Sequence, residues 1–323
     1  MNTLQLLSFG GALPQNKVTN NDLAKIVETS DEWIKSRTGI AERRFCAQGE
    51  TASALAIRAA AQALERSGLQ AEDMDCCLCA TLSGEWAAPS TACLVQRALG
   101  LRENIPVMDV NAACSGFLYG LAAAKGLLEQ TGGKYALVVG CEQLSRLLDM
   151  TDRTTCILFG DGAGAAVVSL GEDGPFALTL GARGGDAIRV EGPGVQPTAI
   201  RMDGPAVFRF AVEAMPRCIR EVLEKSGESM EAVDWFVCHQ ANERIIDLSI
   251  KKLGADPAKF YKNLSHTGNT SAASVPLALN ELWESGAMKP GQTLVCVGFG
   301  AGLTWAGMLL QYRPLAAQTE GNA

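Results

Sequence analysis

Histidine is scarce in this sequence, which contains only His239 and His266 among its 323 residues. No apolar run approaches the roughly 20 residues that a membrane-spanning helix needs. The first residues, Met1 to Leu7, lack the basic region of a secretory signal. A formal net charge of −7 lacks the basic excess that nucleic-acid binding requires. These absences predict a cytoplasmic protein with neither a membrane nor a nucleic acid as its partner.

Cysteine is plentiful, at eleven residues, but a second Cys-x-x-Cys pair is missing. The cluster of Cys76, Cys77 and Cys79 therefore lacks the pair that would complete four zinc ligands. The other cysteines are scattered along the chain, which is typical of a compartment that keeps thiols reduced. The sequence therefore predicts no metal site.

The chain is long enough for one large domain or two smaller ones, and its sequence repeats itself. Leu64-Glu-Arg-Ser-Gly68 returns as Leu223-Glu-Lys-Ser-Gly227, an offset of 223 − 64, or 159, residues. Asn111 corresponds to Asn269 at an offset of 269 − 111, or 158, residues. Several matches in order at a nearly constant offset predict a duplicated half. We place the two halves at residues 1–170 and 171–323.

Each half has the hydrophobic pattern of an α/β fold. Ala52–Ser67 is rich in alanine and leucine and stops at a glycine, which predicts a helix. The glycines before Ala165–Ser169 do not form a dinucleotide site, because that fingerprint needs a helix where this sequence predicts a strand. Other short apolar runs between turn signals also predict buried strands. They are Cys76–Thr81, Ala136–Val139, Trp235–Cys238 and Thr293–Val297.

Cys114 is the strongest candidate for a nucleophile. It lies at the start of a predicted inward-packed helix, where the positive end of the peptide dipoles favours a thiolate. Most free cysteines only fill the core, but the small residues on both sides of Cys114 leave room for a substrate. The apolar face of this helix consists of Phe117, Leu118, Leu121 and Leu128.

His239 and Asn269 are candidates for a pair of hydrogen-bond donors. His239 follows a predicted strand, and under the repeat Asn269 begins the helix equivalent to that of Cys114. Alternatively, His239 is a structural histidine and Asn269 is a turn residue or helix cap. A neutral imidazole and an amide that donate to one carbonyl oxygen stabilise an enolate, whose charge grows as a carboxylate leaves a malonyl thioester. We expect no acidic residue as a third member of this set.

Five motifs carry a specific resemblance to a known family. They are Asp31-Glu-Trp-Ile-Lys-Ser-Arg-Thr-Gly39, Asp109-Val-Asn-Ala-Ala-Cys-Ser-Gly-Phe117, Phe159-Gly-Asp-Gly-Ala-Gly164, His239-Gln-Ala-Asn242 and Gly268-Asn-Thr-Ser-Ala-Ala-Ser-Val-Pro276. With these motifs, from about Asp22 to Trp305, the chain resembles the β-ketoacyl-acyl carrier protein synthase III family of thiolase-like condensing enzymes. The resemblance implies a thiolase-like duplicated αβαβα five-layer fold. It also implies a homodimer that condenses a short acyl-CoA with malonyl-acyl carrier protein to initiate fatty acid synthesis, without a cofactor.

The same motifs imply roles for individual residues. Cys114 resembles the acylated nucleophile, and His239 and Asn269 resemble the pair that promotes decarboxylation. The backbone amides of Cys114 and Ala301 are the implied oxyanion hole. An indole and guanidinium groups hold adenine and phosphates well, and the implied coenzyme A contacts are Trp33, Arg37, Arg153 and Asn242.

Arg244, Lys251 and Lys252 follow His239 on a predicted helix. Because Arg244 and Lys251 are seven residues apart, they lie near one face. They are either an ordinary solvated surface or, as the resemblance implies, a docking patch for the acidic acyl carrier protein. In a chain of net charge −7, a local basic patch offsets repulsion from such a partner.

Three positions depart from the family pattern. Ala301 replaces the middle glycine of three, Pro205 stands where asparagine is common, and Ala88 is small in a loop that in this family lines the partner's primer pocket. A small Ala88 leaves room for a longer or branched primer. Two alternatives therefore stay open. One is a condensing enzyme or acyltransferase of a specialised, polyketide-type pathway, and the other is a Cys-His thioesterase in which His239 activates water or the thiol.

Overall fold

The computed structural model of the protein describes residues 2–192 and 198–315. The residues from Ala316 onward, predicted from their composition to be loose, lie outside the described residues. Within the described ranges, the helices fall short of the length and apolar character that crossing a membrane takes.

The main strands form two half-sheets that meet at one short parallel pair. This pair joins β1 and β13 at Gln5–Gln311 and Leu6–Tyr312. The strand order is β11-β12-β13-β1-β7-β6-β4-β5, and β8 pairs with β13. The strands are β1 Thr3–Ala12, β4 Cys76–Ala80, β5 Val107–Val110, β6 Tyr135–Glu142, β7 Gly162–Gly171, β8 Ala177–Ala182, β11 Trp235–Cys238, β12 Thr293–Gly300 and β13 Thr304–Tyr312.

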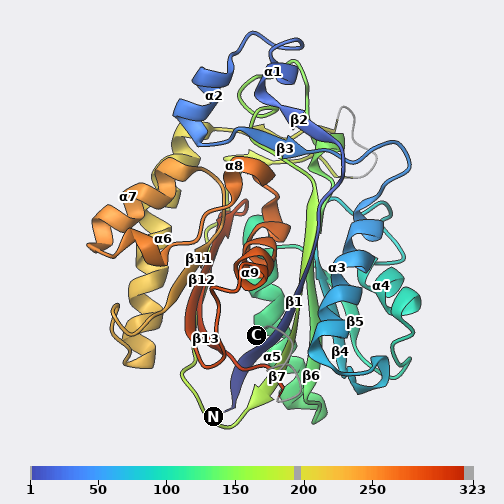
Figure 1. The fold of residues 1–323 in the computed structure, drawn as a ribbon. Coiled ribbons are helices and arrows are strands. Elements are labelled where there is room, and N and C mark those ends of the chain that lie inside the picture. The colour runs from blue at the N-terminus through green and yellow to red at the C-terminus, as the bar shows by residue number, and fades with distance from the viewer. Residues whose placement is uncertain (1, 193–197, 316–323) are drawn as a thin grey trace.

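Helices cover both faces of each half-sheet and complete five layers (Figure 1). α3 and α4 pack on the outer face of one half-sheet, and α6 and α7 cover the other. α5 and α9 lie between the half-sheets and contact both. The predicted thiolase-like αβαβα fold is therefore confirmed. The helices are α3 Ala52–Ser67, α4 Thr91–Leu99, α5 Gly116–Thr131, α6 Gly204–Ser226, α7 Glu243–Leu253 and α9 Ser274–Glu284.

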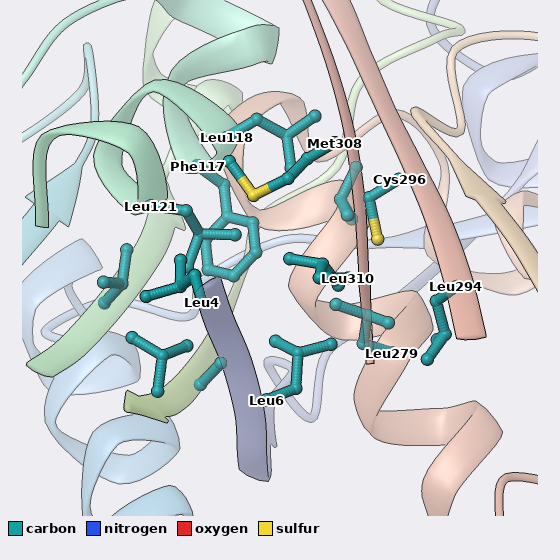
Figure 2. Packing of buried hydrophobic residues seen from close by; sticks show 14 of the residues in the cluster. Leu4, Leu6, Phe117, Leu118, Leu121, Leu279, Leu294, Cys296, Met308 and Leu310 are labelled. Carbon is teal, nitrogen blue, oxygen red and sulfur yellow. The ribbon is translucent and has the colours of Figure 1, made fainter. Parts of the chain in front are cut away.

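The central core lies between the half-sheets, around α5 and α9. In Figure 2, Leu4 of β1 lies near Phe117 and Leu121 of α5, whereas Leu6 lies toward Leu279 of α9 and Leu310 of β13. The four apolar residues predicted to share one face of the Cys114 helix are all at most 1% exposed. Because one continuous apolar cluster draws on both half-sheets, the two halves bury their apolar surface together.

Smaller elements form a cap over one end of the layers, at the top of Figure 1. Arg43 of this cap is fully buried and donates to Asn20 Oδ1 at 2.8 Å and to the carbonyl oxygen of Ile157 at 2.6 Å, which ties the cap to the body.

The short elements are β2 Lys17–Thr19, α1 Asn20–Leu23, α2 Asp31–Thr38, β3 Glu42–Arg44, β9 Ile188–Arg189, β10 Arg201–Met202 and α8 Leu264–Thr267. The 3₁₀ turns are η1 Ala71–Asp73, η2 Ala113–Ser115, η3 Leu144–Leu147, η4 Pro257–Lys259 and η5 Ser271–Ala273.

The internal repeat appears in the backbone. β6 begins at Tyr135 and β12 at Thr293, an offset of 293 − 135, or 158, residues, and η2 and η5 are related by the same offset. Among the described residues, two that are not glycine have positive φ, Ala113 at 46° and Ser271 at 48°. These two residues are also related by the offset of 158 residues. The expected boundary between residues 170 and 171 falls at the end of β7. The division into two halves at that point stays a prediction.

The predicted elements match the structure closely. α3 occupies the predicted range and ends at Gly68, whose φ of 72° is a left-handed cap that favours glycine. β11 has the predicted bounds, whereas β6 and β12 extend beyond theirs by several residues. The stretch after the glycines at 160–164 is the strand β7, so the expected absence of a helix there holds.

Candidate active site

A cavity of about 910 Å³ is lined by residues from both halves of the chain. It brings together Cys114, His239 and Asn269. The predicted site residues along its wall are Trp33, Arg37, Cys114, His239, Asn242, Arg244, Asn269 and Ala301. Arg153, Lys251 and Lys252 are not among the residues that line it.

Cys114 lies in η2, immediately before α5. Glycines of β12 make room for this turn: a Cβ atom on Gly300 would lie 3.1 Å from Cys114 Sγ. Burial raises the pKa of the Cys114 thiol to about 12. This is opposite in direction to the effect expected from the helix dipole, because loss of hydration disfavours the thiolate more than the dipole favours it. At neutral pH the Cys114 side chain is therefore a thiol.

His239 follows β11 and is only 1% exposed. Its backbone N–H donates to the carbonyl oxygen of Val297 at 2.7 Å, and its ring meets the ring of Phe299 edge-on with centroids 5.2 Å apart. Burial lowers the pKa of His239 to about 3, so the imidazole is neutral at physiological pH. Its Nδ1 atom has no hydrogen-bond partner among the described residues.

Asn269 is held by hydrogen bonds on its backbone and its side chain. Its N–H donates to the Leu158 carbonyl at 2.9 Å, and its Oδ1 accepts from the backbone N–H of Ser271 at 2.9 Å. Since the oxygen of the side-chain amide is engaged, the NH₂ group is the part available to a ligand. The equivalent Asn111 makes the same contact with Ala113, at 3.3 Å.

The four predicted coenzyme A contacts lie next to one another. The guanidinium carbons of Arg37 and Arg153 are 5.9 Å and 5.4 Å from the centre of the Trp33 ring. Asn242 donates through Nδ2 to the backbone oxygen of Arg37 at 3.0 Å. Both arginines are exposed, so two cations and one aromatic ring are presented together beside the cavity.

The three predicted docking residues lie on α7 but differ in their surroundings. Arg244 lines the cavity, whereas Lys251 and Lys252 lie at the far end of the helix. Lys252 Nζ donates to the backbone oxygen of Val212 on α6 at 2.9 Å, so part of its role is structural. Our sequence reasoning missed Arg209, an exposed residue of α6 that also lines the cavity. Nothing in its local sequence distinguishes it from other surface arginines.

The three positions that depart from the family pattern are placed differently. Ala301 directly follows β12 and lines the cavity, and its carbonyl oxygen accepts from Thr304 Oγ1 at 2.9 Å. Pro205 lies in the first turn of α6, where a proline fits a helix, and also lines the cavity. Ala88 is exposed in the loop between β4 and α4 and is not among the lining residues.

Glu142 is an acidic residue that our sequence reasoning missed. It is fully buried at the end of β6, close enough to Cys114 to raise the pKa of the thiol. Burial raises the pKa of Glu142 itself to about 7. Glu142 therefore lies near Cys114, whereas the expectation that no acidic residue joins His239 and Asn269 as a third member stays a prediction. The predicted strand ended at Val139, so the sequence pattern alone did not extend the buried region to residue 142.

The cysteine cluster at Cys76–Cys79 lies within β4, where successive side chains point to opposite faces. Cys76 packs in the central core, whereas Cys77 and Cys79 pack on the α3 side. Across the described residues, three or more histidine, cysteine, aspartate or glutamate side chains do not gather anywhere in a way that could hold a metal ion.

Comparison with known proteins connects this geometry to a family. The family model 3-oxoacyl-[acyl-carrier-protein (ACP)] synthase III matches residues 108–184, and the model of its C-terminal part matches residues 223–312. The chain is 44% identical to the beta-ketoacyl-[acyl-carrier-protein] synthase III of Clostridium acetobutylicum, over 97% of this chain and 99% of that protein. It is 46% identical to the beta-ketoacyl-[acyl-carrier-protein] synthase III of Oceanobacillus iheyensis, over 95% of this chain and 98% of that protein.

The chain belongs to the β-ketoacyl-acyl carrier protein synthase III family.

A solved structure agrees with this assignment. The crystal structure of 3-oxoacyl-[acyl-carrier-protein] synthase III from Aquifex aeolicus VF5 is similar with a TM-score of 0.90 and 43% identity, covering 96% of this chain and all of that one. The family recognised from the motifs is therefore confirmed, as is an acyltransferase of the condensing type. These relatives do not favour a thioesterase or an enzyme of a specialised pathway.

Proposed function

We propose that this chain transfers a short acyl group from acyl-CoA to Cys114 and then condenses it with malonyl-acyl carrier protein. The product is a β-ketoacyl-carrier protein, and the reaction initiates fatty acid synthesis. One observation carries the proposal. Cys114, His239 and Asn269 line a single cavity although they come from three distant parts of the chain.

In the first half-reaction Cys114 Sγ attacks the thioester carbonyl and coenzyme A leaves. The negative charge that develops on the carbonyl oxygen is held by the backbone N–H groups of Cys114 and Ala301, both of which line the cavity. Replacing glycine by alanine at residue 301 keeps its N–H, so the departure from the family pattern does not remove this donor.

In the second half-reaction the malonyl thioester loses carbon dioxide. The neutral ring of His239 and the NH₂ group of Asn269 donate to the thioester carbonyl as the enolate forms. A neutral imidazole suits this task because it donates without protonating the enolate. The carbanion then attacks the acyl group on Cys114 and releases its sulfur.

Two surfaces outside the reacting centre recognise the substrates. Trp33, flanked by Arg37 and Arg153, suits an adenine ring with phosphates, and Asn242 holds Arg37 in place. Arg244 and Lys251 on α7 suit the acidic surface of a carrier protein. Lys252 adds its positive charge to the same surface, although its ammonium group donates a hydrogen bond to the Val212 backbone oxygen on α6.

The family resemblance also supports a cytoplasmic homodimer that works without a metal or bound cofactor. Met108 on β5, at one end of the strand order, is 41% exposed, which suits an edge that a second copy covers. Light scattering of the native protein is expected to give about twice the chain mass of 34.1 kDa. A particle of single-chain mass would contradict the dimer.

The experiment that tests the function is intact-protein mass spectrometry of wild type and Cys114→Ser. Each protein is incubated with acetyl-CoA or a longer acyl-CoA, and then with malonyl-carrier protein. We expect one acyl group on wild type only, which is then discharged as β-ketoacyl-carrier protein. Equal labelling of both proteins would reject Cys114 as the nucleophile, and release of free acid would favour a thioesterase.

A further inference from the structure

Two hydroxyl groups beside the Cys114 turn have no part in the reaction described above. Ser115 is fully buried and follows Cys114 in η2, and Thr304 is the first residue of β13. Ser115 Oγ and Thr304 Oγ1 lie 2.7 Å apart, which is the usual length of a hydrogen bond between hydroxyls. Neither residue is among those that line the cavity. The pair can therefore act on the reaction only through the residues that it holds.

The hydroxyl pair joins two backbone turns that are far apart in the sequence. Thr304 Oγ1 lies 2.9 Å from the carbonyl oxygen of Ala301 and 3.1 Å from that of Ala112. Ser115 Oγ lies 2.8 Å from the same Ala112 oxygen. Ala112 directly precedes η2, which carries Cys114, and Ala301 begins the turn between β12 and β13. These contacts fasten one turn to the other.

The hydrogens of the two hydroxyls fit one order of donation. Each hydroxyl has a single hydrogen to donate. The carbonyl oxygen of Ala112 already accepts from the backbone N–H of Ser115 at 3.2 Å. Ser115 can then donate its hydroxyl hydrogen to Thr304, which donates its own to the Ala301 oxygen. In this order a hydrogen lies between the two hydroxyl oxygens, and the link runs without a break from η2 to Ala301.

The two joined turns carry the backbone N–H groups of the proposed oxyanion hole, those of Cys114 and Ala301. Gly300 brings the turns into contact, since an added Cβ atom there would lie 2.9 Å from the Cys114 nitrogen. A bond to the Ala301 carbonyl limits rotation of the residue that supplies the second N–H. Both donors stabilise an oxyanion only where each points at the position that the oxygen takes up. The link therefore controls the relative placement of the two donors.

The internal repeat shows that the turn itself does not need this hydroxyl. At the offset of 158 residues, Ser115 corresponds to Ala273, which has the same place in η5 and is also fully buried. η5 forms a 3₁₀ turn of the same length as η2 with a methyl group in place of the hydroxyl. The hydroxyl is present only in the turn that carries the nucleophile, which favours a role in the site over a role in the fold.

We propose that Ser115 and Thr304 are positioning residues for the oxyanion hole. Their hydroxyls hold the two backbone N–H groups at the angle that the tetrahedral intermediate requires. The inference rests on the proposed function, because it concerns the acyl carbonyl oxygen of that reaction. When Cys114 Sγ bonds to the acyl carbon, an electron pair moves onto this oxygen, and it returns to the carbon–oxygen bond as coenzyme A leaves. Donors that are already in position stabilise this charge without reorienting.

Thr304→Val tests the link, because it removes the hydroxyl, keeps the shape of the side chain and suits a strand. The single-turnover rate of acyl transfer at saturating acetyl-CoA is expected to fall by about 10- to 100-fold, since both donors remain but their placement is relaxed. The acetyl-CoA concentration that gives half of the maximal rate should stay near wild type, because the residue does not line the cavity. Thr304→Ser, which keeps the hydroxyl, is expected to recover most of the rate.

Two further rates distinguish this effect from a general loss of structure. Alkylation of Cys114 by iodoacetamide forms no oxyanion, because Sγ displaces iodide. Its rate, followed on the Cys114 peptide by mass spectrometry, should match wild type. Carbon dioxide release from malonyl-carrier protein relies on His239 and Asn269 in the proposed function and should also stay near wild type. If either rate fell as far as acyl transfer, the pair would support the whole site and the inference would be wrong.

Ser115→Ala, which introduces the residue of the other half, is the second variant, in case Thr304→Val does not fold. It is expected to slow acyl transfer with the same selectivity. Thr293→Val, the same change at the other end of the paired strands β12 and β13 and outside the cavity lining, is the control. Wild-type rates of acyl transfer in both Thr304→Val and Ser115→Ala would overturn this inference alone. A wild-type protein that accepts no acyl group would overturn the proposed function, and the inference with it.

Discussion

Burial raises the pKa of the Cys114 thiol, which is opposite in direction to the effect expected from the helix that follows it. His239 and Glu142 are buried and Cys114 is partly buried, and in each case the loss of hydration favours the neutral form. A neutral thiol and a neutral imidazole suit a reaction whose intermediate is an enolate, because a strong acid beside the enolate would protonate it. Charge then develops only where backbone and side-chain donors are already in position.

Replacing His239 or Asn269 by alanine is expected to separate the two half-reactions. Each loss of a donor should slow decarboxylation by about 10²–10³-fold, while acylation of Cys114 stays within a few-fold of wild type. Carbon dioxide release from malonyl-carrier protein measures the rate of decarboxylation. The intact mass of the protein, followed over time, measures the rate of Cys114 acylation.

The other histidine of the chain provides the control for this experiment. His266 bonds to Glu281 and is not among the cavity residues, so His266→Ala should leave both rates near wild type. If His239→Ala slowed acylation as much as decarboxylation, the assignment of His239 to decarboxylation would be wrong.

At the level of elements, the two central turns are held by glycine contacts that admit no side chain. β6 meets η5 at Gly140, and β12 meets η2 at Gly298 and Gly300. This close packing brings Cys114 and Asn269 into one cavity, because each lies within a few residues of such a contact. The site therefore depends on the packing of strands that are themselves remote from the substrate.

Gly140→Ala is expected to destabilise the protein. The added methyl group would overlap the backbone oxygen of Ala272, and overpacking of this kind typically costs about 1–3 kcal/mol. The free energy of unfolding in urea measures the effect. Gly126→Ala in α5 is the matched control, because a Cβ atom there meets nothing within 4 Å. The control should be neutral or stabilising by up to about 1 kcal/mol, and equal effects in both variants would contradict the packing argument.

At the scale of the whole molecule, a net charge of −7 opposes binding of an acidic carrier protein, and the proposed function assigns its local attraction to the α7 surface. Lys251→Glu is expected to raise the KM for malonyl-carrier protein by roughly fivefold, since an exposed ion pair contributes up to about 1 kcal/mol. The acylation rate with acyl-CoA should not change. Lys289→Glu, the same charge reversal outside the cavity lining, is the control. An unchanged KM in Lys251→Glu would remove this residue from the docking surface.

The two halves are expected to fold only together. α5 packs against β12 and β13 of the second half, and α9 packs against β1 and β7 of the first. Either half alone, 1–170 or 171–323, would expose the face of its central helix. We expect the full chain to unfold in one calorimetric transition and each separate half to lack cooperative unfolding. A stable, cooperatively unfolding half would show that the halves are independent domains.

The sequence alone determined the family, the α/β repeat and three residues that line the cavity, Cys114, His239 and Asn269. These features depend on local patterns: helix α3 has its own stop signal at Gly68, and the motifs around Cys114, His239 and Asn269 are specific without reference to the rest of the chain. The roles of these three residues remain predictions that the proposed experiments test.

Only the tertiary structure decided the protonation state of Cys114 and the presence of Glu142 beside it. A pKa depends on hydration and on neighbours from other parts of the chain, and the local sequence carries neither. Likewise, Lys251 and Lys252 are equivalent in the sequence, but only Lys252 has its ammonium group bonded to α6. Local patterns specify the secondary structure and predict the nucleophile, whereas burial and long-range packing set the free energy of each ionised group.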